Sequence, residues 1–186
     1  MKIGLQIIKS DYELVFASNF SWIHNVNAIE WFIKNVMPEL KSKFPKITLK
    51  ILGANQPANF KNYADLGVIS MGFVQEIQSH LSKANVYIAP LFVGSGVRIK
   101  ILEAMSMSLP VVASPISAEG IIANSKDGLF VAKNKNEFVE MISNLLKNPD
   151  YSINCGKNAR NYVINNHDWK KNISIIHQNY KILSKK

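Results

Sequence analysis

Cysteine is nearly absent from this sequence of 186 residues, and long apolar runs are absent altogether. The single cysteine, Cys155, has no partner within the chain, which excludes an internal disulfide. No stretch reaches the roughly 18 uninterrupted apolar residues that a membrane-spanning helix needs. Residues 1–16 are too polar to hold the apolar region of a signal peptide. These absences make a cytoplasmic protein the default expectation.

Acidic residues are also scarce, with 13 of them against 22 lysines and arginines, so the formal net charge is +9. Such a balance suits an anionic partner, which includes nucleic acid, an anionic membrane face and a phosphorylated ligand. The lysines are dispersed, however, and the sequence has no arginine-rich arm, no aromatic RNA-binding signature and no spacing typical of metal ligands. We therefore expect no nucleic acid and no metal, and we keep peripheral contact with an anionic membrane as a secondary expectation.

Short apolar runs alternate with helical patterns along the chain, in a composition typical of a globular protein. Strands are predicted at 13–18, 47–53, 68–73, 86–91, 110–114 and 128–133. Helices are predicted at 25–44, 74–84, 98–108, 118–125, 135–147, 150–166 and 168–183.

This alternation predicts one α/β domain over residues 1–186, of the Rossmann-like three-layer type, with about six parallel strands and helices on both faces. Ligands bind such sheets at the carboxyl ends of the strands, where the strand order reverses. The loops to inspect are therefore 18–25, 53–58, 72–75, 91–98 and 114–120. The sequence lacks a G-x-G-x-x-G motif after the strand at 47–53, which argues against an unrelated dinucleotide-binding or flavodoxin-like protein.

A glycine-rich turn separates the strand at 86–91 from the next helix, and it consists of Gly94, Ser95, Gly96 and Val97. Glycines let backbone N–H groups approach a ligand, and a helix that begins near Val97 adds unpaired donors and partial positive charge. Arg98 and Lys100, expected in the first turn of that helix, supply further positive charge. The pattern is compatible with a phosphate site or with a simple turn followed by solvated basic residues.

Glu103 is expected on the second turn of the same helix, among apolar neighbours. A carboxylate there must face a cleft or find a partner, because burying an unpaired charge is unfavourable. In a cleft it would accept hydrogen bonds from both hydroxyls of a ribose. The alternative is an exposed carboxylate or an ion pair with Lys100.

Other loops carry weaker candidates. Gly72, Phe73 and Val74 end the strand at 68–73 and would either flank a planar base or form a simple turn. His24 would either contact a ligand or lie on the surface, and Asn25 is a good helix N-cap. The loop that contains Ser114 and Ser117 would either border a ligand or cap the helix at 118–125.

Taken together, the motifs resemble a known family. The order and spacing of "GVISMGFVQEIQSHLSKANVYIAPL", "GSGVRIKILEAMSMSLPVVASPISAEGI" and "DGLFVAKNKNEFVEMISNLLKNP" are similar to the C-terminal, donor-binding half of retaining GT-B glycosyltransferases, the glycosyl transferases group 1 family. The resemblance covers nearly all of residues 13–183.

The resemblance implies a site for a nucleotide-diphosphate sugar, which is a substrate rather than a cofactor, and it implies that no metal is needed. Glu103 would hold the ribose, Gly94–Val97 the diphosphate, and Gly72–Val74 the base. Arg98 and Lys100 would be the catalytic cations that stabilise the departing diphosphate.

Two positions depart from the family pattern. Ser95 stands where many members carry a second glutamate, eight positions before the ribose glutamate, which leaves the contacts to the donor sugar open. The first loop, 18–25, contains His24 but none of the Arg and Lys residues with which many members grip the phosphates.

The family also places the acceptor site in an N-terminal half of similar design, which the 186 residues have no room for. We therefore expect a partner domain or partner chain. Residues 168–186 would form a C-terminal helix that packs either on that partner or on its own domain. Two hypotheses follow: a donor-binding glycosyltransferase domain, or a non-catalytic module that lends sugar-nucleotide affinity to a partner chain.

Overall fold

The computed structural model describes residues 12–167 together with 173, 177 and 180. Its centre is a six-stranded parallel sheet in the order β3-β2-β1-β4-β5-β6. The strands are β1 (Glu13–Ala17), β2 (Thr48–Leu52), β3 (Val68–Gly72), β4 (Val86–Ala89), β5 (Val111–Ala113) and β6 (Leu129–Val131). The chain builds one half of the sheet outward from β1 and the other half outward from β4. The strand order therefore reverses between these two neighbours, as the predicted fold class requires.

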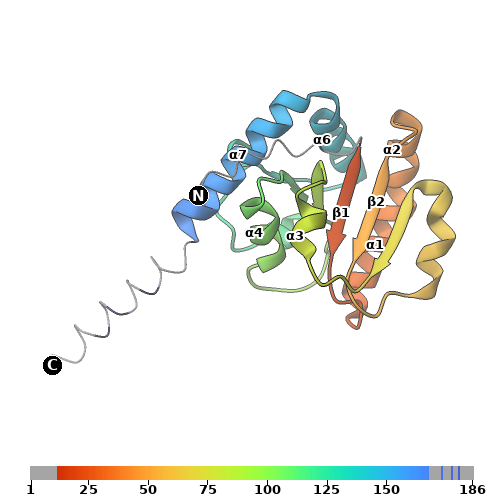
Figure 1. Cartoon of the computed structure of the whole chain (residues 1–186), viewed down its shortest axis with the longest axis horizontal. Helices are drawn as coiled ribbons and strands as arrows, with labels where there is room; N and C mark the ends of the chain where they lie inside the picture. The colour runs from red at the N-terminus through yellow and green to blue at the C-terminus, as the bar shows by residue number, and fades with distance from the viewer. Residues whose placement is uncertain (1–11, 168–172, 174–176, 178–179, 181–186) are drawn as a thin grey trace.

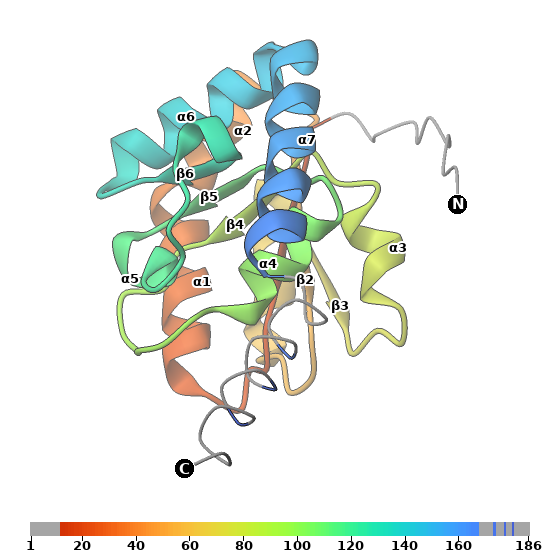
Figure 2. The ribbon, with the colours of Figure 1, turned by 90° about the vertical axis from the view of Figure 1, so that its left-hand side faces the viewer.

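Helices cover both faces of the sheet and complete three layers (Figures 1 and 2). The core of one face is formed with α1 (Ile23–Asn35), α2 (Met37–Lys43) and α6 (Lys135–Lys147). The core of the other face is formed with α3 (Ile77–Leu81), α4 (Ile99–Ser106) and α7 (Pro149–Asn166). The short segments η1 (Ala58–Leu66), α5 (Pro115–Ala118) and η2 (Ser125–Asp127) complete the connections. Strands β1, β4 and β5 are buried along their whole length, which explains why they are almost entirely apolar apart from Glu13 at the start of β1, whose carboxylate pairs with Lys50.

The helix predicted over 25–44 is in fact two helices, so that prediction was wrong in one respect. α1 ends at Asn35, and Val36 joins it to α2, which begins at Met37. Pro38 lies in the first turn of α2, where its missing N–H is harmless, whereas inside a continuous helix its ring would clash with the preceding turn. The predicted apolar face is confirmed, since Ile29, Phe32, Ile33, Val36 and Leu40 are all fully buried.

Of three further predicted helices, two differ from the structure and one lies almost entirely outside the described residues. The helix predicted at 118–125 was wrong: α5 lies earlier, at Pro115–Ala118, because the Ser114 hydroxyl accepts a hydrogen bond from the Ser117 N–H and caps it there. The helix predicted at 74–84 is shorter, Ile77–Leu81. The predicted helix at 168–183, with its expected packing on another domain, lies outside the described residues except for three positions.

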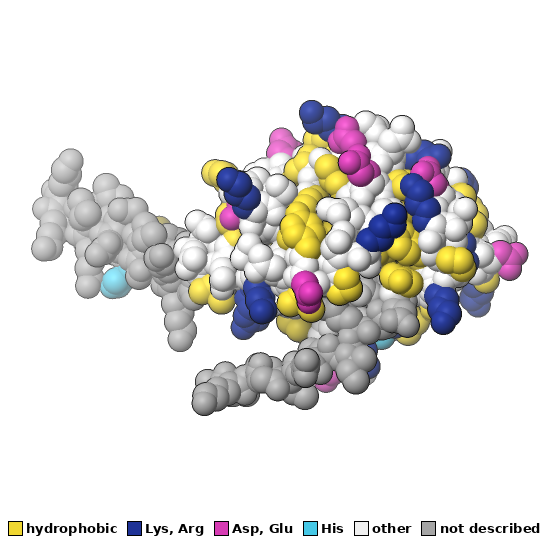
Figure 3. Space-filling model, turned by 90° about the horizontal axis from the view of Figure 1, so that it is seen from above, with side chains coloured by type: hydrophobic (Ala, Val, Ile, Leu, Met, Phe, Trp, Pro, Cys, Tyr) yellow, Lys and Arg dark blue, Asp and Glu magenta, His cyan; other side chains and the backbone are white. Residues whose placement is uncertain are grey.

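None of the helices described over residues 12–167 is long and apolar enough to cross a membrane. On the face viewed in Figure 3, lysine and arginine side chains are interspersed with aspartate and glutamate. Charge of one sign therefore does not gather there into the continuous patch that a nucleic-acid surface would need. The expected contact with an anionic membrane stays a prediction.

Candidate functional site

A cavity of about 290 Å³ opens at the carboxyl ends of β1 and β4, where the strand order reverses. Ligand pockets commonly measure roughly 300–1,000 Å³, so this volume is at the lower end of that range. The lining comes from β1 and its loop, α1, β4 and the start of α4, and it consists of Phe16, Ala17, Ser18, His24, Asn25, Tyr87, Ala89, Leu91, Val97, Arg98, Ile99, Lys100 and Ile101. Two of the five loops that the sequence selected, 18–25 and 91–98, thus meet here.

The start of α4 forms one wall of the cavity. The helix begins at Ile99 with Arg98 as its N-cap residue, two positions later than the sequence suggested, because the backbone of Arg98 is still extended. No side chain caps this helix end, and no acidic residue lies in its first turn. The wall therefore combines an uncapped helix N-terminus with the side chain of Lys100, an arrangement that favours an anion.

The guanidinium of Arg98 folds back over the glycine-rich turn. Its Nη1 donates a hydrogen bond to the Ser95 carbonyl oxygen at 3.2 Å, and a Cβ at Gly94 would overlap Nη2. With φ at +127°, Gly94 also has a backbone conformation that other residues rarely adopt. Nε and Nη2 of Arg98 are buried and have no hydrogen-bond partner. Unpaired buried donors of a cation are unfavourable, so they mark a place where an anion would be stabilised.

Glu103 does not line the cavity. Its side chain is 42% exposed, and its Oε2 accepts a hydrogen bond from Nζ of Lys100 at 3.0 Å. The ion-pair alternative is therefore the arrangement observed. Lys100 connects Glu103 to the cavity, because it lines the cavity and also forms the ion pair with the Glu103 carboxylate.

Loop 91–98 is anchored at its first residue. The Leu91 N–H donates to the Ser117 hydroxyl at 3.0 Å, and the Ser114 hydroxyl donates to the Leu91 carbonyl oxygen. Both serines are fully buried. Neither serine lines the cavity. Of the two roles that the sequence had left open, Ser114 has that of a helix cap, on α5, and both serines also hold the loop in place.

His24 lies in the cavity wall, as expected for a ligand-contacting residue, and its imidazole stacks on the indole of Trp22. Asn25 is not the N-cap of α1, contrary to the sequence-based expectation. That position belongs to Trp22, and Asn25 Nδ2 instead donates to the Asn19 carbonyl oxygen at 2.7 Å. The helix can therefore begin two residues earlier and bring His24 and Asn25 to the cavity from its first turn.

Tyr87 is a site residue that sequence reasoning missed. It lies on β4 with its ring buried, and its hydroxyl donates to the Ala17 carbonyl oxygen at the end of β1, 3.2 Å away. Burial raises the pKa of Tyr87, and the negative charge of Glu103 raises it further. The hydroxyl therefore stays protonated and ties together the two strands that frame the cavity. A tyrosine inside an apolar strand gives no distinct signal in the sequence.

The predicted base-binding residues lie apart from the cavity. Gly72 ends β3 and Phe73 and Val74 follow it, and β2 separates that edge strand from β1. Phe73 is 74% exposed, and a Cβ at Gly72 would meet open space. Gly94, Ser95 and Gly96 do not line the cavity either, although they adjoin it through Val97 and Arg98.

Curated relatives cover most of this chain. A protein of the cps region of Klebsiella pneumoniae, uncharacterised and of 44.6 kDa, is 26% identical over 172 residues, which are 88% of this chain and 44% of that protein. An uncharacterised glycosyltransferase of Methanocaldococcus jannaschii is 25% identical over 175 residues, which are 89% of this chain and 44% of that protein. The chain thus spans about half the length of the curated relatives it matches.

Solved structures of low sequence identity share the fold. S. aureus TarM superimposes with a TM-score of 0.77 at 18% identity, covering 93% of this chain and 36% of that one. Anabaena HepE, solved in complex with UDP, has a TM-score of 0.73 at 16% identity, and the match covers 95% of this chain and 49% of HepE. The C-terminal domain of a group 1 glycosyltransferase from Francisella tularensis has a TM-score of 0.66 at 19% identity. That match covers 87% of this chain and 89% of the Francisella domain.

These likenesses agree with the six-stranded architecture of one half of a GT-B glycosyltransferase. The model of the glycosyl transferases group 1 family matches residues 11–148, which include every strand, the cavity and α4. The chain therefore belongs to the glycosyl transferases group 1 family.

Proposed function

We propose that this chain binds the nucleotide-diphosphate sugar from which a retaining glycosyltransferase transfers a sugar to a glycan or lipid-linked acceptor. One observation carries the proposal: Arg98, which has two buried donors without a partner, lines a cavity at the reversal of strand order together with Lys100 and the uncapped start of α4. HepE was solved with UDP and with UDP-glucose, and TarM with UDP, which supports a nucleotide diphosphate as the ligand.

In this proposal the diphosphate lies against the first N–H groups of α4. Arg98 and Lys100 provide positive charge there, and His24 lines the same cavity. When the bond between the sugar and the diphosphate breaks, negative charge grows on the leaving oxygen. Fixed cations and a helix N-terminus stabilise that charge more than they stabilise the intact donor, which lowers the barrier.

The ribose role of Glu103 requires a change at Lys100. In the structure Lys100 holds Glu103, so a diphosphate that draws Lys100 into the cavity would release the carboxylate for the ribose hydroxyls. Gly72, Phe73 and Val74 remain the proposed base contacts, with the exposed ring of Phe73 available for stacking.

The chain covers about half of its curated relatives, so the acceptor site and the transfer reaction are proposed for the assembly with a second domain or partner chain. By itself the chain is expected to bind the donor without transferring the sugar. The alternative, a non-catalytic module, differs only in whether the assembly with the second half transfers sugar.

Calorimetry with uridine, UMP, UDP and the corresponding adenine and guanine nucleotides would test the proposal. We expect affinity to rise with each phosphate, because each adds charge beside Arg98 and Lys100, and we expect the diphosphate of one base to bind tightest. Equal affinity for nucleoside and nucleoside diphosphate would remove the phosphates from this cavity. Turnover of the bound donor in the presence of the second half would then separate the two functions.

A further inference from the structure

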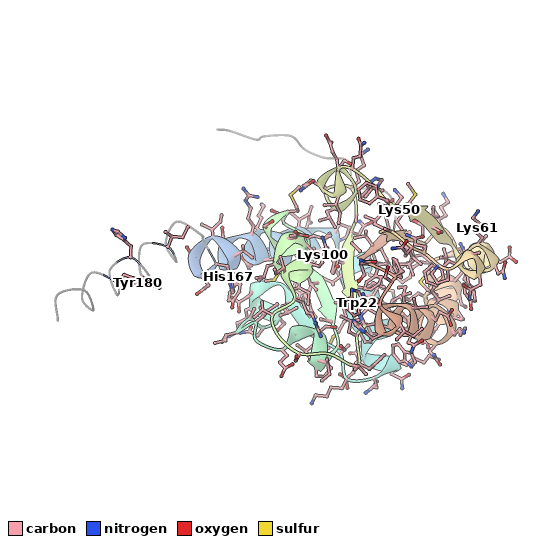
Figure 4. All side chains as sticks on the ribbon, turned by 90° about the horizontal axis from the view of Figure 1, so that it is seen from below. Trp22, Lys50, Lys61, Lys100, His167 and Tyr180 are labelled. Carbon is pink, nitrogen blue, oxygen red and sulfur yellow. The ribbon has the colours of Figure 1, made fainter. Side chains whose placement is uncertain are left out.

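Trp22 exposes a large aromatic surface in the connection that follows β1, two residues before His24, which lines the cavity. Its side chain is 61% exposed, although it lies in the short connection between β1 and α1, within the folded body of the domain. Trp22 and Lys100 lie on the same face of the molecule, the one seen from below in Figure 4. An indole held in water at the mouth of a cavity is unusual, because burying it elsewhere would stabilise the fold.

The backbone around this indole is well ordered by hydrogen bonds. As the N-cap residue of α1, Trp22 accepts the Asn25 N–H on its carbonyl oxygen at 2.9 Å. One position earlier, the Ser21 hydroxyl accepts a hydrogen bond from Asn55 Nδ2 at 2.7 Å, which ties the connection to the loop after β2. The indole is thus presented from a fixed backbone, and little conformational freedom remains to be lost when a ligand binds.

One face of the indole is already occupied. The ring of His24, which lines the cavity, stacks on it with centroids 6.1 Å apart and planes inclined by 28°. The side chain of Trp22 nevertheless stays 61% exposed, so much of the indole remains accessible. A one-sided aromatic surface suits a ring that has one apolar face, and a pyranose has such a face, made of axial C–H groups.

The connection that carries Trp22, and the Asn55 side chain bonded to it, include uncharged polar residues. Asn19, Ser21 and Asn55 are exposed, and they offer amide and hydroxyl groups without a formal charge. Neutral donors and acceptors match the hydroxyls of a sugar and do not match a phosphate, which would need a cation. Arg98 and Lys100 therefore belong to the α4 side of the cavity, and Trp22 belongs to the α1 side.

We propose that Trp22, backed by His24, is a stacking surface for a pyranose ring at the mouth of the cavity. The inference rests on the proposed function, because it assigns the sugar part of the same site. The ring belongs either to the donor sugar or to a saccharide acceptor, which have the same chemistry here. Stacking on an indole depends on the C–H face more than on the hydroxyl pattern, so several hexoses should be recognised weakly.

Saturation-transfer NMR with methyl glycosides of glucose, galactose, mannose and N-acetylglucosamine tests this directly. We expect transfer to the ring C–H protons of at least one glycoside. Trp22→Ala should abolish it, Trp22→Phe should retain part of it, and Ile122→Ala, which changes another exposed apolar side chain, should leave it unchanged. The absence of transfer from every glycoside, or transfer undiminished in Trp22→Ala, would overturn the proposal.

Calorimetry with UDP and UDP-glucose then identifies the source of the ring. If UDP-glucose binds more tightly than UDP and Trp22→Ala removes that advantage of about threefold to tenfold, the ring is the donor sugar. If Trp22→Ala affects only the methyl glycosides, the ring is that of an acceptor. An equal loss of UDP and UDP-glucose affinity would place the nucleotide on the indole and refute the stacking role. Glycoside binding without any UDP binding would refute the proposed function alone.

Discussion

Replacing Arg98 by alanine separates the stability of the domain from its affinity for a nucleotide diphosphate. In the ligand-free chain the guanidinium makes one hydrogen bond, to the Ser95 carbonyl oxygen, while Nε and Nη2 are buried without a partner. Removing one ordinary hydrogen bond destabilises a protein by about 0.5–1.5 kcal/mol, and removing two unsatisfied donors offsets that loss. We therefore expect the free energy of unfolding to change by less than about 1 kcal/mol.

The same substitution should weaken binding markedly. A hydrogen bond to a charged group contributes about 1.5–3 kcal/mol, so the loss of a single bond from Arg98 to the diphosphate raises the Kd for UDP roughly tenfold to a hundredfold. Arg98→Lys should give an intermediate affinity, because it keeps the charge but lacks the planar fork of donors. Calorimetry with UDP and urea denaturation measure the two quantities on the same samples.

Arg160 provides the matched control, as the only other arginine of the sequence. From α7 its Nη1 donates to the Ser106 carbonyl oxygen at the end of α4, away from the cavity. Arg160→Ala should therefore lower stability by about 1 kcal/mol and leave UDP affinity unchanged. Unchanged UDP affinity in Arg98→Ala, or a loss of stability larger than that of Arg160→Ala, would refute the reasoning.

Three further predictions concern other parts of the chain. Glu103→Ala should weaken UDP binding by about 1–3 kcal/mol with little change in fold, while Glu140→Ala on α6 should not, and equal affinities by calorimetry would remove Glu103 from the site. Gly156→Ala should lower the free energy of unfolding by about 1–3 kcal/mol, measured by urea denaturation, because its Cβ would overlap the Ser108 carbonyl oxygen. A higher free energy of unfolding would contradict this and show that α7 can shift. Burial raises the pKa of the Cys155 thiol, so less thiolate is present at pH 8 than for a free cysteine, and a disulfide reagent should label the native chain far more slowly than the urea-unfolded chain. Equal labelling rates would contradict the burial.

Local sequence patterns were sufficient for the sheet and for two of the loops that line the candidate cavity. Apolar runs between helical patterns predicted six parallel strands, and the rule for strand reversal selected loops 18–25 and 91–98, which do meet at the cavity. Two of the errors in helix boundaries had signals in the sequence as well. Pro38 marked the break between α1 and α2, and Ser114 followed by Pro115 marked the start of α5.

Only the tertiary structure decided what the side chains of the site do. The sequence placed Arg98, Lys100 and Glu103 on one stretch of chain, but the fold turned the guanidinium over Gly94 and paired the carboxylate with Lys100. It also buried Tyr87 beneath the cavity and left Trp22 in water. The reason is physical: periodicity follows from backbone geometry within a few residues, whereas the direction and partners of a side chain depend on groups that only packing brings near.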